Sequence, residues 1–184
     1  AEVMERIIQP TVAAMARDGR AYSGVFFAGL MLTDQGPKLI EYNCRFGDPE
    51  CQVLMMRFEG DLAALLLAAA SEGGLAGAAR PTLSDGYALT VVMAAKGYPD
   101  TPEKGGAIGI GAIGDARIFH AGTASNNGQL VANGGRVLNV TARRATVTEA
   151  QERAYAAVDA IDFPTGFCRR DIGWREVARE KAAG

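Results

Sequence analysis

Three polar side chains alternate along an otherwise apolar stretch of the sequence: Glu41, Asn43 and Arg45. If an extended strand runs through this stretch, the three groups point to one face within about 13 Å, at about 3.3 Å per residue. A carboxylate and an amide oxygen two residues apart form part of a coordination shell for Mg²⁺. A guanidinium beside them can bind a phosphate or a developing acyl phosphate through its planar fork. The spacing therefore fits phosphoryl transfer onto a carboxylate.

The same spacing also has a purely structural explanation, which is the commoner one. A strand that leaves the core carries polar residues on its solvent side, and an exposed Glu–Arg pair there contributes little stability. Spacing alone therefore leaves the function of the three residues open.

The neighbouring segments predict the elements that position these residues. Two extended apolar runs, 24–33 and 38–44, are separated by turn residues and predict a hairpin whose strands are covered on both faces. The Asp-Pro-Glu sequence that follows is typical of a helix start with Asp48 as the N-cap. We therefore expect helices over about 49–58 and 60–71.

The first residues also follow a helical period, but no N-cap precedes them and the first residue is Ala1 rather than Met. Pro10 should kink or end this helix, and Asp18-Gly19 should stop the turn that follows it. We therefore expect the chain to begin inside a longer protein.

The second half of the sequence has a different pattern, in which short strand candidates are separated by glycine-containing turns. A capping box of Thr146 and Glu149 starts one helix, whose stripe of small and branched residues can lie against a sheet. The predicted fold class is α+β, with domains at 1–80 and 81–184. The strand candidates are 87–95, 107–113, 117–120, 129–132 and 136–142.

Composition limits the classes of function. The net charge is −2, from 19 basic and 21 acidic residues, which gives no field for attracting nucleic acid or an anionic membrane. Three cysteines without a CxxC spacing argue against a disulfide framework and a structural zinc site. The longest apolar stretch, 62–70, is too short to cross a bilayer. We therefore expect a cytoplasmic protein without nucleic-acid or membrane partners.

A resemblance to ATP-grasp carboxylate–amine ligases, in their metal-binding hairpin, covers residues 22–52, YSGVFFAGLMLTDQGPKLIEYNCRFGDPECQ. The RFGDPE sequence within it is similar to that of the phosphoribosylamine–glycine ligase family. The resemblance continues in the same order through GYALTVVMAAKGYP, IFHAGT, NGGRVLNVTA, EAQERAY and FCRRDIGW. The ExNxR spacing is shared across ATP-grasp enzymes, whereas RFGDPE followed by FHAGT and NGGRVL is highly specific for this family.

The resemblance implies a role for each polar residue around the hairpin. Glu41 and Asn43 would bind the Mg²⁺ or Mn²⁺ ions that bridge the phosphates of ATP, the co-substrate. Arg45 would be catalytic and substrate-binding, as the partner of a phosphate or acyl phosphate. Asp48 would help to place glycine or 5-phosphoribosylamine, a role that is compatible with an N-cap.

The resemblance also implies the first portion's fold and the reaction. Residues 1–80 would be the C-terminal portion of an ATP-grasp domain, followed by a small antiparallel sheet with a covering helix. In this family of de novo purine biosynthesis, ATP phosphorylates the carboxylate of glycine. The amine of 5-phosphoribosylamine then attacks the acyl phosphate to give glycinamide ribonucleotide, ADP and phosphate, a reaction that depends mainly on positioning and charge neutralisation.

The resemblance covers less than half of a family member. The family's amino-terminal domain, glycine-rich lid, nucleotide-contacting lysines and adenine hinge all precede the point where this sequence begins. We therefore expect a C-terminal fragment that is inactive as a ligase without the N-terminal part of the same protein. An unpaired strand edge or exposed apolar surface would favour self-association. Two alternatives stay open: a fragment of another ATP-grasp ligase or carboxylase, and a non-catalytic stand-alone module.

Other reactive residue types have structural explanations. His120 fits hydrogen bonding in the core or in a turn, although its loop could border a ribose phosphate in the whole enzyme. Trp174 fits an anchor that packs the tail of the chain onto the domain. We expect the cysteines to be small buried fillers and the C-terminal arginines to form surface pairs rather than an anion patch. These residues are Cys44, Cys51, Cys168, Arg169, Arg170 and Arg175.

Overall fold

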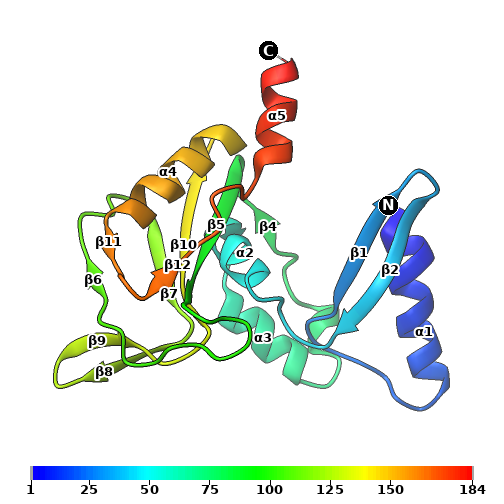
Figure 1. Ribbon diagram of the computed structural model, residues 1–184. Helices are drawn as coiled ribbons and strands as arrows, with labels where there is room; N and C mark the ends of the chain where they lie inside the picture. Colours follow the sequence, from blue (N-terminus) through cyan, green and yellow to red (C-terminus); the bar gives the residue numbers. More distant parts are fainter. Residues whose placement is uncertain (1, 184) are drawn as a thin grey trace. The chain divides into compact units, whose positions relative to one another are not determined.

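The computed structural model describes residues 2–183, which form two compact units of mixed helix and strand (Figure 1). Unit 1 holds the residues up to Asp48 together with Gly60–Thr82, and unit 2 holds Pro49–Glu59 and the residues from Leu83 onward. The predicted α+β class is confirmed. The domain division at residue 80 stays a prediction, and the segment 49–59, expected in the first portion, groups with unit 2. Within residues 2–183, no helix is both long and apolar enough to cross a membrane.

Unit 1 begins with two consecutive helical segments, a π-helix η1 (Met4–Ile8) and the α-helix α1 (Gln9–Arg17). Pro10 lies in the first turn of α1, directly after the π turn. Because proline has no N–H to donate and its ring crowds the preceding turn, the wider π turn accommodates it without ending the helix. The helix stops where expected, since Gly19 follows in the left-handed region with φ +72°.

The predicted hairpin is formed by β1 (Phe27–Thr33) and β2 (Gly36–Asn43), which pair in antiparallel fashion. The prediction that its strands are covered on both faces is wrong. None of their residues is buried, and Leu32 and Ile40 are 80% and 63% exposed. In the described chain the two strands pair only with each other, so their continuous apolar pattern is not matched by covering elements.

Two of the predicted helices are present with small shifts. In unit 1, α3 (Leu62–Ala70) is capped by Asp61, whose carboxylate accepts from the Ala64 N–H at 2.9 Å, and the 3₁₀ turn η2 (Gly74–Ala76) follows. In unit 2, α2 spans Glu50–Arg57. The prediction of Asp48 as its N-cap is wrong, because Pro49 occupies that position with a non-helical φ of −101°.

The centre of unit 2 is a four-stranded antiparallel sheet in the order β12-β5-β10-β7. Three two-stranded pairs accompany it: β3 with β4, β6 with β11, and β8 with β9. The strands of the main sheet are β5 (Tyr87–Ala95), β7 (Arg117–His120), β10 (Arg136–Arg144) and β12 (Gly166–Phe167). The shorter ones are β3 (Phe58–Glu59), β4 (Thr82–Leu83), β6 (Gly109–Ile110), β8 (Thr123–Asn126), β9 (Gln129–Ala132) and β11 (Ile161–Asp162).

One face of this sheet is covered by α4 (Val147–Asp159), as predicted (Figure 1). The predicted capping box is present, with the Thr146 side chain accepting from the Glu149 N–H at 3.1 Å. Small residues let the helix approach the sheet closely, because they add little thickness between backbone and backbone. The buried contacts join Ala150, Ala154 and Val158 of α4 to Leu89, Val91, Leu138 and Val140 of the sheet.

The opposite face of the sheet is also covered. Asn139 and Thr141 alternate with the residues that face α4, yet both are fully buried. Because α2 contacts the same two strands, β5 and β10, we place α2 on this second face. The Thr141 hydroxyl donates to the Thr90 hydroxyl at 2.8 Å there.

The end of the chain forms a further helix, α5 (Trp174–Ala183), for which the sequence predicts no element. The Glu180 carboxylate accepts from the N–H groups of Val147 and Thr148 at 2.7 and 2.8 Å, so α5 caps the start of α4. The prediction of Trp174 as an anchor is wrong: its side chain is 54% exposed, and Val177 is the buried residue of the helix.

Candidate metal site on the hairpin

The end of β2 brings two oxygen-bearing side chains together. Asn43 Nδ2 donates a hydrogen bond to Glu41 Oε1 at 3.0 Å, so the two side chains share one face of the strand. Glu41 is exposed and Asn43 is half-buried, which leaves the pair open to solvent. The geometry agrees with the alternation expected for these two residues.

Room for Glu41 comes from a glycine on the partner strand. Gly29 pairs with Glu41 across the ladder, and the register shifts directly after it. A Cβ at position 29 would lie 3.0 Å from Glu41 Cγ, so a larger residue would displace the carboxylate. The ExNxR and RFGDPE motifs do not include Gly29, although a glycine inside a strand pattern is a known sign of close approach.

The other face of β2 is fixed against α1. Tyr42 Oη lies 2.6 Å from the hydroxyl of Thr11, and the Tyr42 ring stacks on Phe26 with centroids 4.7 Å apart. Because side chains alternate along a strand, holding Tyr42 on the helix side turns its two neighbours to the opposite face. The orientation of Glu41 and Asn43 therefore depends on this contact.

Arg45 lies outside the strand, so the condition under which all three polar side chains share one strand face is not met. β1 begins at Phe27, which pairs with Asn43, so the ladder offers no partner beyond that point. Arg45 occupies the bend that follows, with an exposed side chain whose Nη1 donates to the Phe46 carbonyl at 2.9 Å. Asp48 lies further along, with an exposed side chain in the turn before α2. Strand alternation therefore does not place Arg45 or Asp48 beside the pair.

The donor set of the pair suits a hard divalent cation. One carboxylate and one amide oxygen are weak ligands alone, and Mg²⁺ keeps water or phosphate oxygens in its other positions. Binding requires the Asn43 amide to turn so that Oδ1 replaces Nδ2 next to Glu41. Among residues 2–183, no group of three or more His, Cys, Asp or Glu side chains could hold a metal ion. From the described residues, a cation here would therefore take the Glu41 and Asn43 oxygens.

The histidine and the cysteines lie outside this pair. His120 is exposed and its Nδ1 lies 3.0 Å from the Thr123 hydroxyl, which confirms hydrogen bonding in a turn. The prediction of buried cysteines is wrong, because Cys44 is exposed and Cys51 and Cys168 are half-buried. Partial burial raises the pKa of the Cys168 thiol.

The C-terminal arginines form surface pairs, as expected. Arg169 donates two hydrogen bonds to the Asp171 carboxylate, at 2.9 and 2.6 Å, and these bonds lower the pKa of Asp171. Arg170 pairs with Asp159 at 2.7 Å, and the Arg175 guanidinium lies 5.4 Å from the centre of the Trp174 ring.

Comparison with known proteins identifies two domains of one enzyme, in chain order. The family model described as "Phosphoribosylglycinamide synthetase, ATP-grasp (A) domain" matches residues 1–51, which include the hairpin. The model described as "Phosphoribosylglycinamide synthetase, C domain" matches residues 88–175, which include the main sheet and α4.

Relatives with high identity carry one name. The phosphoribosylamine–glycine ligase of Mesorhizobium japonicum is 64% identical over 98% of this chain and 43% of its own length. The protein of the same name from Escherichia coli is 49% identical over 97% of this chain and 42% of its own length. The crystal structure of phosphoribosylamine–glycine ligase from Thermotoga maritima matches with a TM-score of 0.79 and 38% identity, over 92% of this chain and 42% of that one. The chain thus spans less than half the length of these relatives. The domain models, the identities and the shared structure together show that the chain belongs to the phosphoribosylglycinamide synthetase family.

Proposed function

We propose that this chain is the C-terminal portion of the ligase that joins glycine to 5-phosphoribosylamine in purine biosynthesis, acting in the cytoplasm. The names of the relatives support this reaction, and the chain covers about two-fifths of their length. Both family models belong to the same enzyme. The remaining part of the protein is the partner that this portion requires.

The observation that carries the proposal is the pairing of Glu41 with Asn43 on an open face of β2. In the ligase, Glu41 and Asn43 would hold Mg²⁺ or Mn²⁺ beside the phosphates of ATP. A cation held there would neutralise charge on those phosphates. Gly29 and Tyr42 serve this arrangement, because one leaves room for the carboxylate and the other fixes the strand face.

The reaction has two steps. The terminal phosphoryl group of ATP passes to a carboxylate oxygen of glycine, which gives an acyl phosphate and ADP. The amine nitrogen of 5-phosphoribosylamine then attacks the acyl carbon, the C–O bond to phosphate breaks, and the nitrogen loses a proton to leave an amide. Arg45, in the bend after the strand, would bind the phosphate oxygens as their charge changes, and Asp48 would hold glycine or the amine.

A turnover assay tests the proposal. The chain alone and the chain extended to the length of its relatives are each given glycine, 5-phosphoribosylamine and MgATP, and ADP and the amide product are measured. We expect turnover by the extended protein and none by the chain alone. The exposed pair of Glu41 and Asn43 is not sufficient to hold the nucleotide or to keep water out of the site.

Two results would overturn the proposal. If the extended protein converts no substrate, although it is folded, the assigned reaction is wrong and the stand-alone module is the better explanation. If the chain alone converts substrate at the rate of the extended protein, the proposal that it requires the remaining part of the protein is wrong.

A further inference from the structure

The helix α2 belongs to unit 2 by its contacts and not by continuity of the chain. The chain enters unit 2 at Pro49, leaves it after Glu59 and returns at Leu83, so segments of unit 1 flank α2 on both sides. Noncovalent contacts, chiefly with β5 and β10, therefore hold the helix on the sheet. No residue from Glu50 to Arg57 is buried, so this attachment is shallow.

The C-terminal end of α2 is fixed by hydrogen bonds to one residue, the buried Ser84. Arg57 donates to the Ser84 carbonyl from Nε at 3.2 Å and from Nη2 at 2.9 Å. The Ser84 N–H donates in return to the Arg57 carbonyl at 2.7 Å. Arg143 of β10 donates to the hydroxyl of the same serine. These bonds join the end of the helix to β10 and to the segment before β5.

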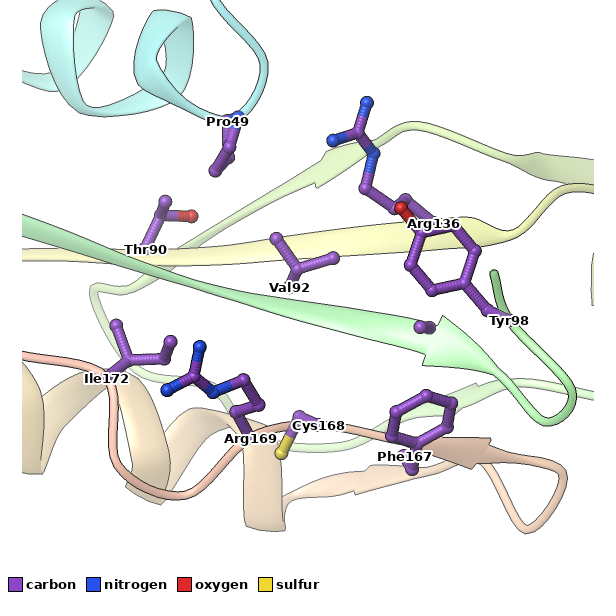
Figure 2. Close-up of a pocket in the computed structure, with 10 residues that line it drawn as sticks. Pro49, Thr90, Val92, Tyr98, Arg136, Phe167, Cys168, Arg169 and Ile172 are labelled. Carbon is purple, nitrogen blue, oxygen red and sulfur yellow. The ribbon is translucent and has the colours of Figure 1, made fainter. Parts of the chain in front are cut away.

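The N-terminal end of α2 is held differently. Within residues 2–183, no side chain caps the helix at Pro49, and this residue borders a hollow of about 340 Å³. Thr90, Val92 and Ala94 of β5 also line the hollow, and Figure 2 shows Pro49 facing Thr90 across it. One end of the helix therefore stands over open space, whereas the other end is bonded to its neighbours.

A buried amide lies on the sheet face that α2 covers. Asn139 pairs with Val92 of β5 and Phe119 of β7, and its side chain is fully buried. Within the described chain, neither its Nδ2 nor its Oδ1 has a hydrogen-bond partner. Thr141, on the same face, donates by contrast to Thr90. Because an amide that loses its hydration and gains no partner costs free energy, the closed position of α2 is penalised at Asn139.

We propose that α2 is a hinged cover of this sheet face, which opens at its Pro49 end, turns about its Arg57 end and exposes the Asn139 amide to water. Hydration of the amide in the open position recovers the free energy that burial costs, so Asn139 raises the population of that position. The loop that carries Arg45 and Asp48 leads directly into the end that opens, so opening displaces this loop. The hinged cover does not depend on the function proposed above.

The test is hydrogen exchange of the backbone amides in the full chain. We expect the hydrogen-bonded amides of α2 to exchange at least about tenfold faster than those of β5 and β10, because the helix opens while the sheet stays folded. Asn139→Leu fills a similar volume without polar atoms, so it should slow the exchange of α2 about tenfold. Arg57→Gln weakens the hinge and should accelerate this exchange by a similar factor, about tenfold. The matched control is Asn126→Leu, at an exposed position of β8, which should leave α2 unchanged.

Thiol alkylation, followed residue by residue, gives a second readout in the same preparation. Cys51 lies on α2 and is half-buried, whereas Cys44 precedes the helix and is exposed. Asn139→Leu should slow the alkylation of Cys51 about tenfold, because the helix opens less often. The alkylation of Cys44 should not change, since this thiol is accessible in both positions of the helix.

Three outcomes would overturn the proposal. The first is that the amides of α2 exchange as slowly as those of β5 and β10, which would show that the helix opens only when unit 2 unfolds. The second is that α2 exchanges equally fast in folded Asn139→Leu and Asn126→Leu, which would remove the role of the buried amide. The third is that Arg57→Gln leaves the exchange of α2 unchanged, which would remove the hinge. The first and third outcomes decide the proposal even if Asn139→Leu does not fold.

Discussion

At the scale of single residues, the candidate metal site depends on contacts on both faces of one strand. Glu41 needs the space that Gly29 leaves, and the Tyr42–Thr11 contact keeps Glu41 and Asn43 on the same open side. Arg45 is different, because it lies in the bend after the strand and is held by the carbonyl of Phe46. The strand ladder therefore orients the two candidate metal ligands, whereas the loop after the strand orients Arg45.

Replacing Arg45 with lysine in the extended protein separates these roles. Lysine keeps the charge but loses the planar fork, so we expect kcat to fall roughly 10²-fold, as for the loss of an oriented donor at a developing negative charge. The affinity for Mn²⁺ should not change, because Arg45 is not a ligand. Steady-state kinetics measures kcat, and a metal titration of the same preparation measures the affinity for Mn²⁺. A kcat equal to that of the unchanged protein would remove Arg45 from the mechanism.

The sequence was sufficient to predict the chemical pair but not its surroundings. The alternation that predicts a shared face for Glu41 and Asn43 is a local property of a strand. The end of the strand at Asn43 is set by where β1 begins, 16 residues earlier in the chain, and local spacing does not contain that information. The roles of all four polar residues around the hairpin stay predictions.

At the scale of elements, α5 is held to α4 by a carboxylate. The Thr148 hydroxyl and the N–H groups of Val147 and Thr148 all donate to Glu180, and these bonds lower its pKa below the ordinary value of 4.5. A carboxylate at a helix N-terminus also interacts favourably with the helix dipole. The contact thus joins the end of the chain to the covering helix.

This contact predicts a pH dependence. Because the pKa of Glu180 is lower in the folded state, its stabilising effect is complete above about pH 4.5 and is lost as the pH falls through the folded pKa. We expect the hydrogen-exchange protection factors of α5 to fall in this acid range. Glu180→Gln should show the lower protection already at neutral pH, whereas Glu176→Gln, which removes only an exposed pair with Arg179, should not. Unchanged protection in Glu180→Gln would contradict this assignment.

Elements with a strong local signal were predicted well. The capping box and the small-residue stripe define α4, the mostly apolar run defines β5, and alternating apolar residues define β10. The short strands β11 and β12 and the position of α2 over the second face were missed. Strands of two residues have almost no period of their own, and they exist because β5 or β6 is there to pair with.

At the scale of the whole molecule, the two units differ in how they are stabilised. Every buried hydrophobic residue of the described chain belongs to unit 2, from Leu89 to Val177, whereas unit 1 has partly buried contacts only. Hydrophobic burial is the main stabilising contribution to a folded unit. We therefore expect the amides of β1 and β2 to exchange far faster than those of β5 and β10.

A core substitution should act on unit 2 alone. Leu138 of β10 is fully buried in the core of unit 2, so Leu138→Ala should lower the free energy of unfolding of this unit by about 2–5 kcal/mol. Leu32→Ala, at an 80% exposed position, should change stability by no more than about 0.5 kcal/mol. Hydrogen exchange across a urea series measures both units separately. An equal loss in both units after Leu138→Ala would show that they unfold together.

The exposed apolar residues of the hairpin favour self-association of the chain. Met31, Leu32 and Ile40 are more than half exposed, and among residues 2–183 each strand of the hairpin pairs on one edge only. We expect the chain alone to self-associate, and a Leu32→Lys, Ile40→Lys double variant to do so less. Light scattering at increasing concentration measures this, and a monomer of the unchanged chain at high concentration would contradict it.

The most direct measurement of the central claim is the binding of Mn²⁺, in the presence of ATP, to the extended protein and its hairpin variants. Paramagnetic relaxation of water protons gives the dissociation constant of the metal from the nucleotide complex. If Glu41 and Asn43 are the ligands, Glu41→Gln and Asn43→Leu each weaken Mn²⁺ at least about tenfold, while Asp34→Asn, at the exposed turn of the same hairpin, leaves it unchanged. Equal affinity in all four proteins would show that the metal is held elsewhere.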